Sequence, residues 1–241
     1  MPAIGPRRFP GSDRTWRPGT LLYRLSLRAR DDLLALGAPR LYGDGQAILR
    51  EGVRDTHVVL LLTGFAKVTA AAVEGASLLD IRGPGDVVGE LAAVSGQCRS
   101  ATVTACGPVL SRVVMQDDFR RFLERNPDAA VQLTSVVGDR LAFANRRRLE
   151  FIWHSIPCRL ARVISELATI CGEVTADGHI RLCAPIKQVE LAALIGASEA
   201  SVHKALGKLR AQRLVTTGYR RIVILAPDRL RDIGGLVDSG S

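Results

Sequence analysis

Gly89, Glu90 and Leu91 are followed, after seven intervening residues, by Arg99 and Ser100, and together these residues could hold an anion that carries a sugar. A glycine lets the backbone approach a ligand with no side chain in between. Glu90 can accept hydrogen bonds from sugar hydroxyls, while Arg99 offers a planar, permanently charged fork to a phosphate. A surface salt bridge between Glu90 and Arg99 is the alternative interpretation. The order, the spacing and the strand-like residues that follow favour a ligand site.

Short apolar runs broken by glycine, proline and aspartate surround these residues, from about 41 to 115. The runs fall at 57–62, 65–69 and 101–105, and the breaks fall at 42–45, 83–86 and 107–108. Many short strands separated by turn residues are typical of a sandwich or jelly roll. We therefore expect a β-roll.

A helical pattern replaces the strands after Asn126 and continues to about His154. Apolar residues recur along it every seven positions, with two more interleaved: Ala130, Val137, Ala144 and Phe151, then Leu133 and Leu141. Such a seam indicates one long helix that packs against its own domain or against a second copy of itself. Pro157 marks the end of the helix and a natural hinge.

The last third of the chain contains two helical segments joined by a tight turn. Gly196 stands where the chain must leave the first segment, about 186–195, in a left-handed conformation. Ser198 can cap the second segment, 199–212, through its side-chain oxygen. A hairpin is expected at 214–224, with basic residues beside its tip. Helix, glycine turn and capped helix form the pattern of a helix-turn-helix, although an ordinary helical hairpin can share it.

These two regions, in this order, resemble the transcription regulators of the cyclic-AMP receptor protein and fumarate-nitrate reduction (CRP/FNR) family, over about residues 21–226. Residues 89–103 resemble the phosphate-binding cassette of the family's cyclic-nucleotide-binding domain, and residues 186–224 resemble its DNA-binding domain. The resemblance implies an α+β fold with three parts: a cyclic-nucleotide-binding β-roll (jelly roll) at 21–126 with a helix over about 26–36 ahead of its strands, a dimerisation helix at 127–155, and a winged helix-turn-helix at 156–241. The arginines, prolines and glycines of the segment before them predict a flexible basic tail at 1–20.

The function that the resemblance implies is a dimeric regulator whose sequence-specific DNA binding is controlled by a small ligand. A cyclic nucleotide, cAMP or cGMP, is the expected effector, and the alternative is the same regulator with another ligand or with none. The expected partners are double-stranded DNA with a twofold-symmetric operator, a second copy of the chain, and RNA polymerase in the case of an activator. A module that regulates a partner protein instead of DNA is a further possibility.

The resemblance also assigns site residues. The ligand site would consist of Gly89, Glu90, Leu91, Arg99, Ser100, Ala144 and Asn145. The DNA contacts would come from Lys187, Ser198, Glu199, Ala200, Ser201, His203, Lys204, Lys208, Arg220 and Arg221, with Val202 in the same stretch. Phosphate contacts fix the position of such a protein on DNA, and base-edge contacts supply the choice of sequence.

Two positions depart from the pattern of the cyclic-AMP-binding members. Counting back from Pro157 places Ala144 where those members have a threonine that contacts the adenine, and alanine cannot make that hydrogen bond. Members that read TGTGA half-sites carry Arg-Glu directly after the helix-opening serine, whereas this chain has Glu199 and Ala200 there. The effector and the operator sequence are therefore both open.

Composition fits a nucleic-acid partner and argues against other classes. The chain of 241 residues has a net charge of +9, and seven arginines against one aspartate lie within residues 1–30. Five scattered cysteines without a C-x-x-C pair predict reduced cytoplasmic thiols. Four scattered histidines and no His-x-His argue against a metal-dependent jelly-roll enzyme, and no nucleophile-elbow, P-loop or dinucleotide motif is present. We therefore expect no catalysis, no metal, no iron–sulfur cluster, no haem and no membrane span.

Overall fold

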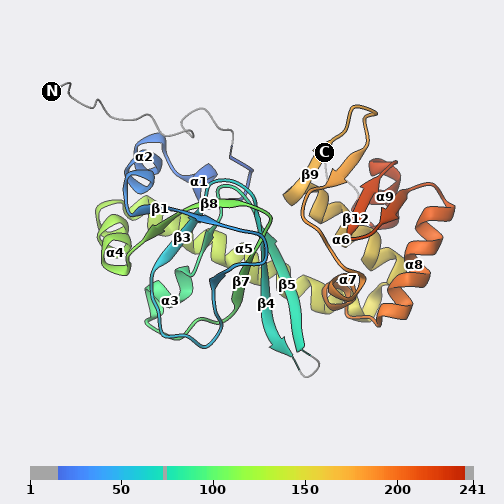
Figure 1. The fold of residues 1–241 in the computed structure, drawn as a ribbon, viewed down its shortest axis with the longest axis horizontal. Helices are drawn as coiled ribbons and strands as arrows, with labels where there is room; N and C mark the ends of the chain where they lie inside the picture. The colour runs from blue at the N-terminus through green and yellow to red at the C-terminus, as the bar shows by residue number, and fades with distance from the viewer. Residues whose placement is uncertain (1–15, 73–74, 237–241) are drawn as a thin grey trace.

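The computed structural model describes residues 16–72 and 75–236. They form two units joined by one long helix (Figure 1). The N-terminal unit comprises α1 (Leu21–Arg24), α2 (Leu27–Ala35), β1 (Ala38–Tyr42), β2 (Ala47–Leu49), β3 (Val58–Leu61), β4 (Phe65–Ala72), β5 (Gly75–Arg82), β6 (Val87–Val88), α3 (Glu90–Ser95), β7 (Thr102–Cys106), β8 (Val109–Val114) and α4 (Gln116–Arg125). The joining helix is α5 (Pro127–Trp153).

Two four-stranded antiparallel sheets build the expected β-roll. Their strand orders are β1-β8-β3-β6 and β2-β7-β4-β5. Side chains from both sheets meet in one apolar core, which includes Tyr42, Leu61, Ala66 and Val103. The short apolar runs and glycine-rich breaks in the sequence correctly predicted this roll, because the apolar runs form strands that face the core and the breaks form the turns between them.

Helices α1, α2 and α4 and the first half of α5 cover the roll through a second apolar core. Trp16 and Thr20 are buried, although both were expected in the flexible tail. Arg17 between them donates to the Asp86 carboxylate at 3.1 Å. The rest of the expected tail, residues 1–15, lies outside the described residues. Leu133 of α5 is buried in this core too, so that seam residue packs on its own domain.

The C-terminal unit comprises α6 (Ile156–Cys171), β9 (Gly172–Val174), β10 (Ile180–Leu182), α7 (Gln188–Ile195), α8 (Glu199–Ala211), β11 (Val215–Gly218), β12 (Arg221–Ile224) and α9 (Pro227–Ile233). Its sheet has the order β11-β12-β10-β9. The long helix α5 ends at Trp153 and α6 begins at Ile156, so the helix is interrupted just before Pro157, as the sequence predicted. In the described part of the chain, no helix is long and apolar enough to cross a bilayer.

The two units share a contact along β4 and β5. Leu78 and Ile81 of β5 belong to the apolar core of the C-terminal unit, where they meet α7. Lys67 of β4 reaches the same helix, and its Nζ lies 2.7 and 2.8 Å from the two carboxylate oxygens of Glu190. Glu190 also accepts a hydrogen bond from the Lys187 backbone N–H, which caps the start of α7. One roll side chain thus holds the first turn of the helix-turn-helix.

Candidate functional site

A cavity of about 650 Å³ lies between the sheet β2-β7-β4-β5, helix α3 and the second half of α5. This volume falls within the about 300–1,000 Å³ that is typical of small-ligand sites. The expected ligand residues in its wall are Gly89, Glu90, Leu91, Arg99, Ser100 and Ala144. Asn145 is exposed on α5 and does not line the cavity. The structure therefore brings all but one of the expected ligand residues together.

The cassette begins with Gly89, which is the N-terminal cap of α3 at φ +83°. A Cβ atom there would lie 2.4 Å from Nη1 of Arg99 and 3.0 Å from the carbonyl oxygen of His57. Both the left-handed backbone and the close approach of Arg99 require glycine. The backbone turns directly from Gly89 into α3.

Arg99 is buried and its guanidinium is held in a fixed orientation by three acceptors. It donates to the Asp55 carboxylate, to the Gly89 carbonyl at 2.8 Å and to the His57 carbonyl at 2.5 Å. A guanidinium carries five N–H groups. Two of those of Arg99 therefore have no acceptor among the described residues and remain available to a ligand. Burial lowers the pKa of His57, and the charge of Arg99 lowers it further against the opposing effect of Asp55.

Glu90 is buried in the same wall but pairs with a different arginine. Arg140 of α5 donates to the Glu90 carboxylate at 2.6 Å and to the Val87 carbonyl at 2.9 Å. The salt bridge between Glu90 and Arg99 that was weighed as an alternative is not formed. Burial lowers the pKa of Arg140, and the charge of Arg82 lowers it further.

Asp55 and Arg140 are site residues that sequence reasoning missed. Asp55 lies 44 residues from Arg99, and Arg140 lies 50 residues from Glu90. No local pattern marks either residue, because each pairing depends on how the strands and α5 come together. The partly exposed carboxylate of Asp55 and the largely buried guanidinium of Arg140 keep both cassette charges paired.

The helix-turn-helix forms as the sequence predicted. Gly196 ends α7 at φ +59°, and a Cβ atom there would lie 2.9 Å from the Phe151 ring of α5. The Ser198 hydroxyl oxygen accepts a hydrogen bond from the Ser201 backbone N–H and caps α8. Val202 is buried in the core and does not reach a groove surface. Ser201 is half-buried beside the cap.

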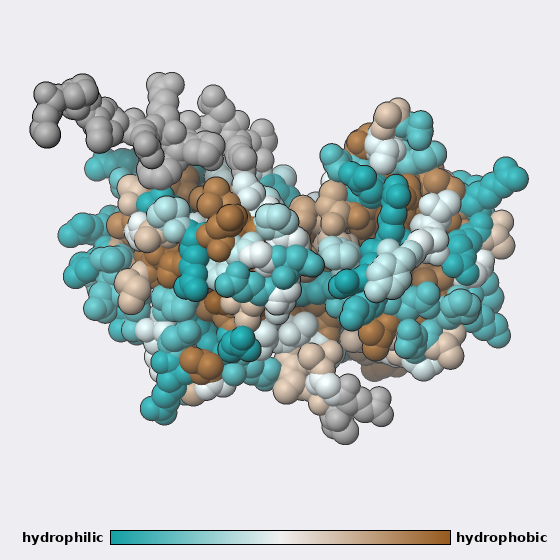
Figure 2. Space-filling view, viewed as in Figure 1, coloured by the Kyte–Doolittle hydropathy of each residue, from teal (hydrophilic) through white to brown (hydrophobic). Residues whose placement is uncertain are grey.

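The other expected DNA-contacting residues are all exposed, namely Lys187, Ser198, Glu199, Ala200, His203, Lys204, Lys208, Arg220 and Arg221. Hydrophilic residues cover most of the side of the molecule that α8 forms (Figure 2). A second concavity, of about 520 Å³, lies between α7, α8 and the β11–β12 wing. Lys187, Glu199, His203, Arg220 and Arg221 line it.

The wing also contains a residue that sequence reasoning missed. Tyr219 at its tip is 91% exposed, and Arg220 beside it has φ +54°, which closes the tight turn. Arg210 of α8 donates to the Thr217 hydroxyl at 2.7 Å and so ties the wing to the second helix. An exposed aromatic ring next to arginines suits contact with a nucleic acid backbone or base.

One face of α5 is apolar and exposed. Its residues include Val131, Leu141, Leu149, Ile152 and Trp153, each at least 60% exposed. Of the expected seam, Leu141 lies on this face, Leu133 is buried in the roll, and Ala144 faces the cavity. A ligand cavity beside a long helix with an open apolar face, joined to a winged helix-turn-helix, defines the class of ligand-controlled, dimeric DNA-binding regulators.

Comparisons with known proteins agree with this class. The cyclic nucleotide-binding domain family matches residues 39–126, and the Crp-like helix-turn-helix domain family matches residues 158–233. The CRP-like cAMP-activated global transcriptional regulator of Mycobacterium tuberculosis is 27% identical over 187 residues, which cover 77% of this chain and 83% of that protein. The HTH-type transcriptional regulator Cmr of the same organism is 24% identical over 205 residues, covering 84% and 80%.

Solved structures with the same fold agree with these matches. A CRP/FNR-family transcriptional regulator from Thermus thermophilus has a TM-score of 0.69 at 25% identity, covering 82% of this chain and 98% of that one. FixK2 from Bradyrhizobium japonicum has a TM-score of 0.69 at 19% identity, covering 86% and 99%. The chain belongs to the CRP/FNR family of transcription regulators.

Proposed function

We propose that this protein is a homodimeric regulator whose affinity for DNA depends on a cyclic nucleotide bound beside Arg99. The observation that carries the proposal is the position of Glu90 and Arg99 in one cavity wall, facing the helix that leads to the DNA-binding unit. The M. tuberculosis relative is named as cAMP-activated. Cyclic AMP and cyclic GMP are the candidate effectors.

The ligand residues have separate roles in this proposal. The two remaining N–H groups of Arg99, together with Ser100, bind the phosphate, and Asp55 keeps the guanidinium in position. Glu90 accepts hydrogen bonds from the ribose hydroxyl, while Arg140 holds the carboxylate against α5. Since both charges are already paired and buried, the pocket is preorganised and little side-chain entropy is lost on binding.

The proposal also assigns a role to each domain of the chain. The roll at 21–126 senses the ligand, α5 at 127–155 forms the dimer interface through its apolar face, and the unit at 156–241 binds DNA. The residues that contact DNA are Lys187, Ser198, Glu199, Ala200, Ser201, His203, Lys204, Lys208, Arg220 and Arg221. Asn145 on α5 would reach the ligand pocket of the partner subunit. The protein acts in the cytoplasm by binding and not by catalysis, without metal, iron–sulfur cluster or haem, and contacts RNA polymerase where it activates.

Calorimetry of the purified protein against cAMP and cGMP, followed by DNA binding with each nucleotide, tests the proposal. Arg99→Ala should weaken nucleotide binding about ten- to a hundredfold, because it removes charge-assisted hydrogen bonds. Arg50→Ala removes the same charge from an exposed position of the roll and should bind as the wild type does. Circular dichroism checks the fold, since Arg99→Ala also leaves Asp55 without its partner. Wild-type affinity in a folded Arg99→Ala variant would contradict the proposal.

A further inference from the structure

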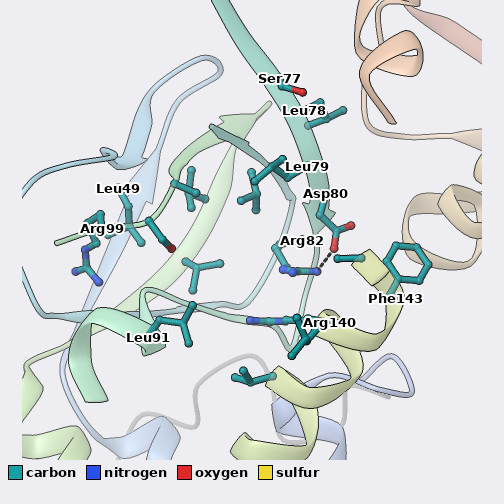
Figure 3. Close-up of a pocket in the computed structure, with 18 of the residues that line it drawn as sticks. Leu49, Ser77, Leu78, Leu79, Asp80, Arg82, Leu91, Arg99, Arg140 and Phe143 are labelled. Atoms are coloured by element: carbon teal, nitrogen blue, oxygen red, sulfur yellow. Dashed lines mark hydrogen bonds and ion pairs between the residues drawn. The ribbon is translucent and has the colours of Figure 1, made fainter. Parts of the chain in front are cut away.

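Asp80 and Arg82 of β5 form an ion pair in the cavity wall, on the side away from Arg99 (Figure 3). Residues two apart in a strand lie on the same face of the sheet. Ile81 between them faces the other way, into the apolar core of the C-terminal unit. Phe143 lies beside the pair, and Ala144 follows on the same helix. This side of the cavity would receive the base of a nucleotide whose phosphate is bound at Arg99.

The pair presents more hydrogen-bond donors than acceptors to the cavity. Arg82 Nη1 donates to Asp80 Oδ2 at 2.6 Å, and this bond uses one of the five N–H groups of the guanidinium. No other acceptor for Arg82 is found among residues 16–72 and 75–236. Asp80 has both oxygens engaged, because its Oδ1 accepts the Ile81 backbone N–H at 2.8 Å. The two side chains are only 14% and 15% exposed, so those donors face the cavity and not bulk water.

A second phosphate is a poor match for this position. The charge of Arg82 is balanced by Asp80, and the nearby Arg140 is balanced by Glu90. Burial opposes the charge on Arg82, but Asp80, Asp86 and Glu90 together raise its pKa. The Asp80–Arg82 pair is therefore close to neutral and still offers N–H donors, which suits an uncharged group with adjacent acceptors.

The two purine bases differ at the edge that such a donor would read. Guanine presents two adjacent acceptors, N7 and O6, and a guanidinium can bind both at once. Adenine presents N7 beside an N6 amino group, which is itself a donor and would oppose an Arg N–H. We propose that Arg82, positioned by Asp80, selects the base and favours guanine over adenine. The inference rests on the proposed function and moves base recognition from α5, where Ala144 offers no polar group, to β5.

Calorimetry with cGMP and cAMP on the full-length protein tests the inference. The wild type should favour cGMP by about ten- to a hundredfold, which is the discrimination expected of a bidentate arginine. Arg82→Leu should lose this preference by binding cGMP more weakly while still binding cAMP. Retained cAMP binding would show that the variant pocket is folded. Arg121→Leu, which removes the same charge from the exposed surface of α4, should keep the wild-type preference.

Ligand analogues give a second measurement that needs no substitution. Cyclic 7-deaza-GMP lacks the N7 acceptor and should bind the wild type more weakly than cGMP. Cyclic IMP keeps N7 and O6 and should bind as cGMP does. Equal binding of cGMP and cAMP by the wild type, or an unchanged preference in Arg82→Leu, would overturn the assignment. Failure of the wild type to bind either nucleotide would instead overturn the proposed function and the inference with it.

Discussion

Replacing Lys67 with methionine would measure how strongly the roll and the DNA-binding unit are coupled. Lys67 and Glu190 are 10% and 18% exposed in their side chains, and Nζ contacts both carboxylate oxygens. Breaking a fully buried ion pair costs about 3–5 kcal/mol, because the remaining charge stays without a partner. Glu190 is partly exposed and keeps the Lys187 N–H at 2.7 Å. We therefore expect Lys67→Met to lower the free energy of unfolding by about 2–3 kcal/mol.

A double-mutant cycle separates the ion pair from other effects of the substitution. Urea unfolding of the wild type, Lys67→Met, Glu190→Gln and the double variant should give a coupling energy of about 2 kcal/mol. The exposed pair Arg181–Glu173 serves as the reference, with side chains 44% and 59% exposed, and its coupling should be within error of zero. A coupling between Lys67 and Glu190 no larger than that of the reference pair would refute the reasoning.

Three further predictions concern single positions. Ala144→Thr should increase the affinity for cAMP in calorimetry, because the added hydroxyl can bond to the adenine; unchanged or lower affinity would contradict the position assigned to Ala144. Replacing Glu199 and Ala200 with Arg and Glu should shift the operator preference towards TGTGA half-sites, because arginine reads guanine through N7 and O6. Selection from random duplexes measures the preference, and recovery of TGTGA by the wild type would contradict it. Burial holds the pKa of His57 below its usual 6.5, so the unfolded chain binds more protons and stability falls as the pH drops below about 6.5. His57→Gln should make that loss smaller in thermal unfolding between pH 7 and pH 5, and an identical pH profile would exclude the role of His57.

Local patterns in the sequence were sufficient to predict most of the fold. The turn at Gly196 needs a residue that adopts a left-handed backbone conformation, and the cap at Ser198 needs a side-chain oxygen. The residue types at both positions therefore indicate the turn and the cap in the sequence. The Gly89 turn is equally specific, because the chain packs Arg99 against the bare backbone. Such features depend on residues close in the chain, and composition and spacing therefore predicted them.

Contacts between distant segments could not be read from the sequence. Asp55 and Arg140 orient the cassette charges from other elements, and Lys67 joins the roll to α7 across 123 residues. No local pattern marks Arg82, which the structure places in the cavity wall. Trp16 is buried for the same reason, although it lies in the segment expected to be a tail. Its packing against the helices that cover the roll depends on contacts between distant segments and not on local propensity.

The cavity wall includes Ala193 and Leu194, which belong to the first helix of the helix-turn-helix. The sensor pocket is thus closed in part by the DNA-binding unit itself. Linkage then applies in both directions, and operator DNA must change the affinity for an effector by the same factor by which the effector changes the affinity for DNA. The effector concentration at which the protein responds is consequently a joint property of protein and operator, and two promoters with different operators would set two different thresholds in the same cell.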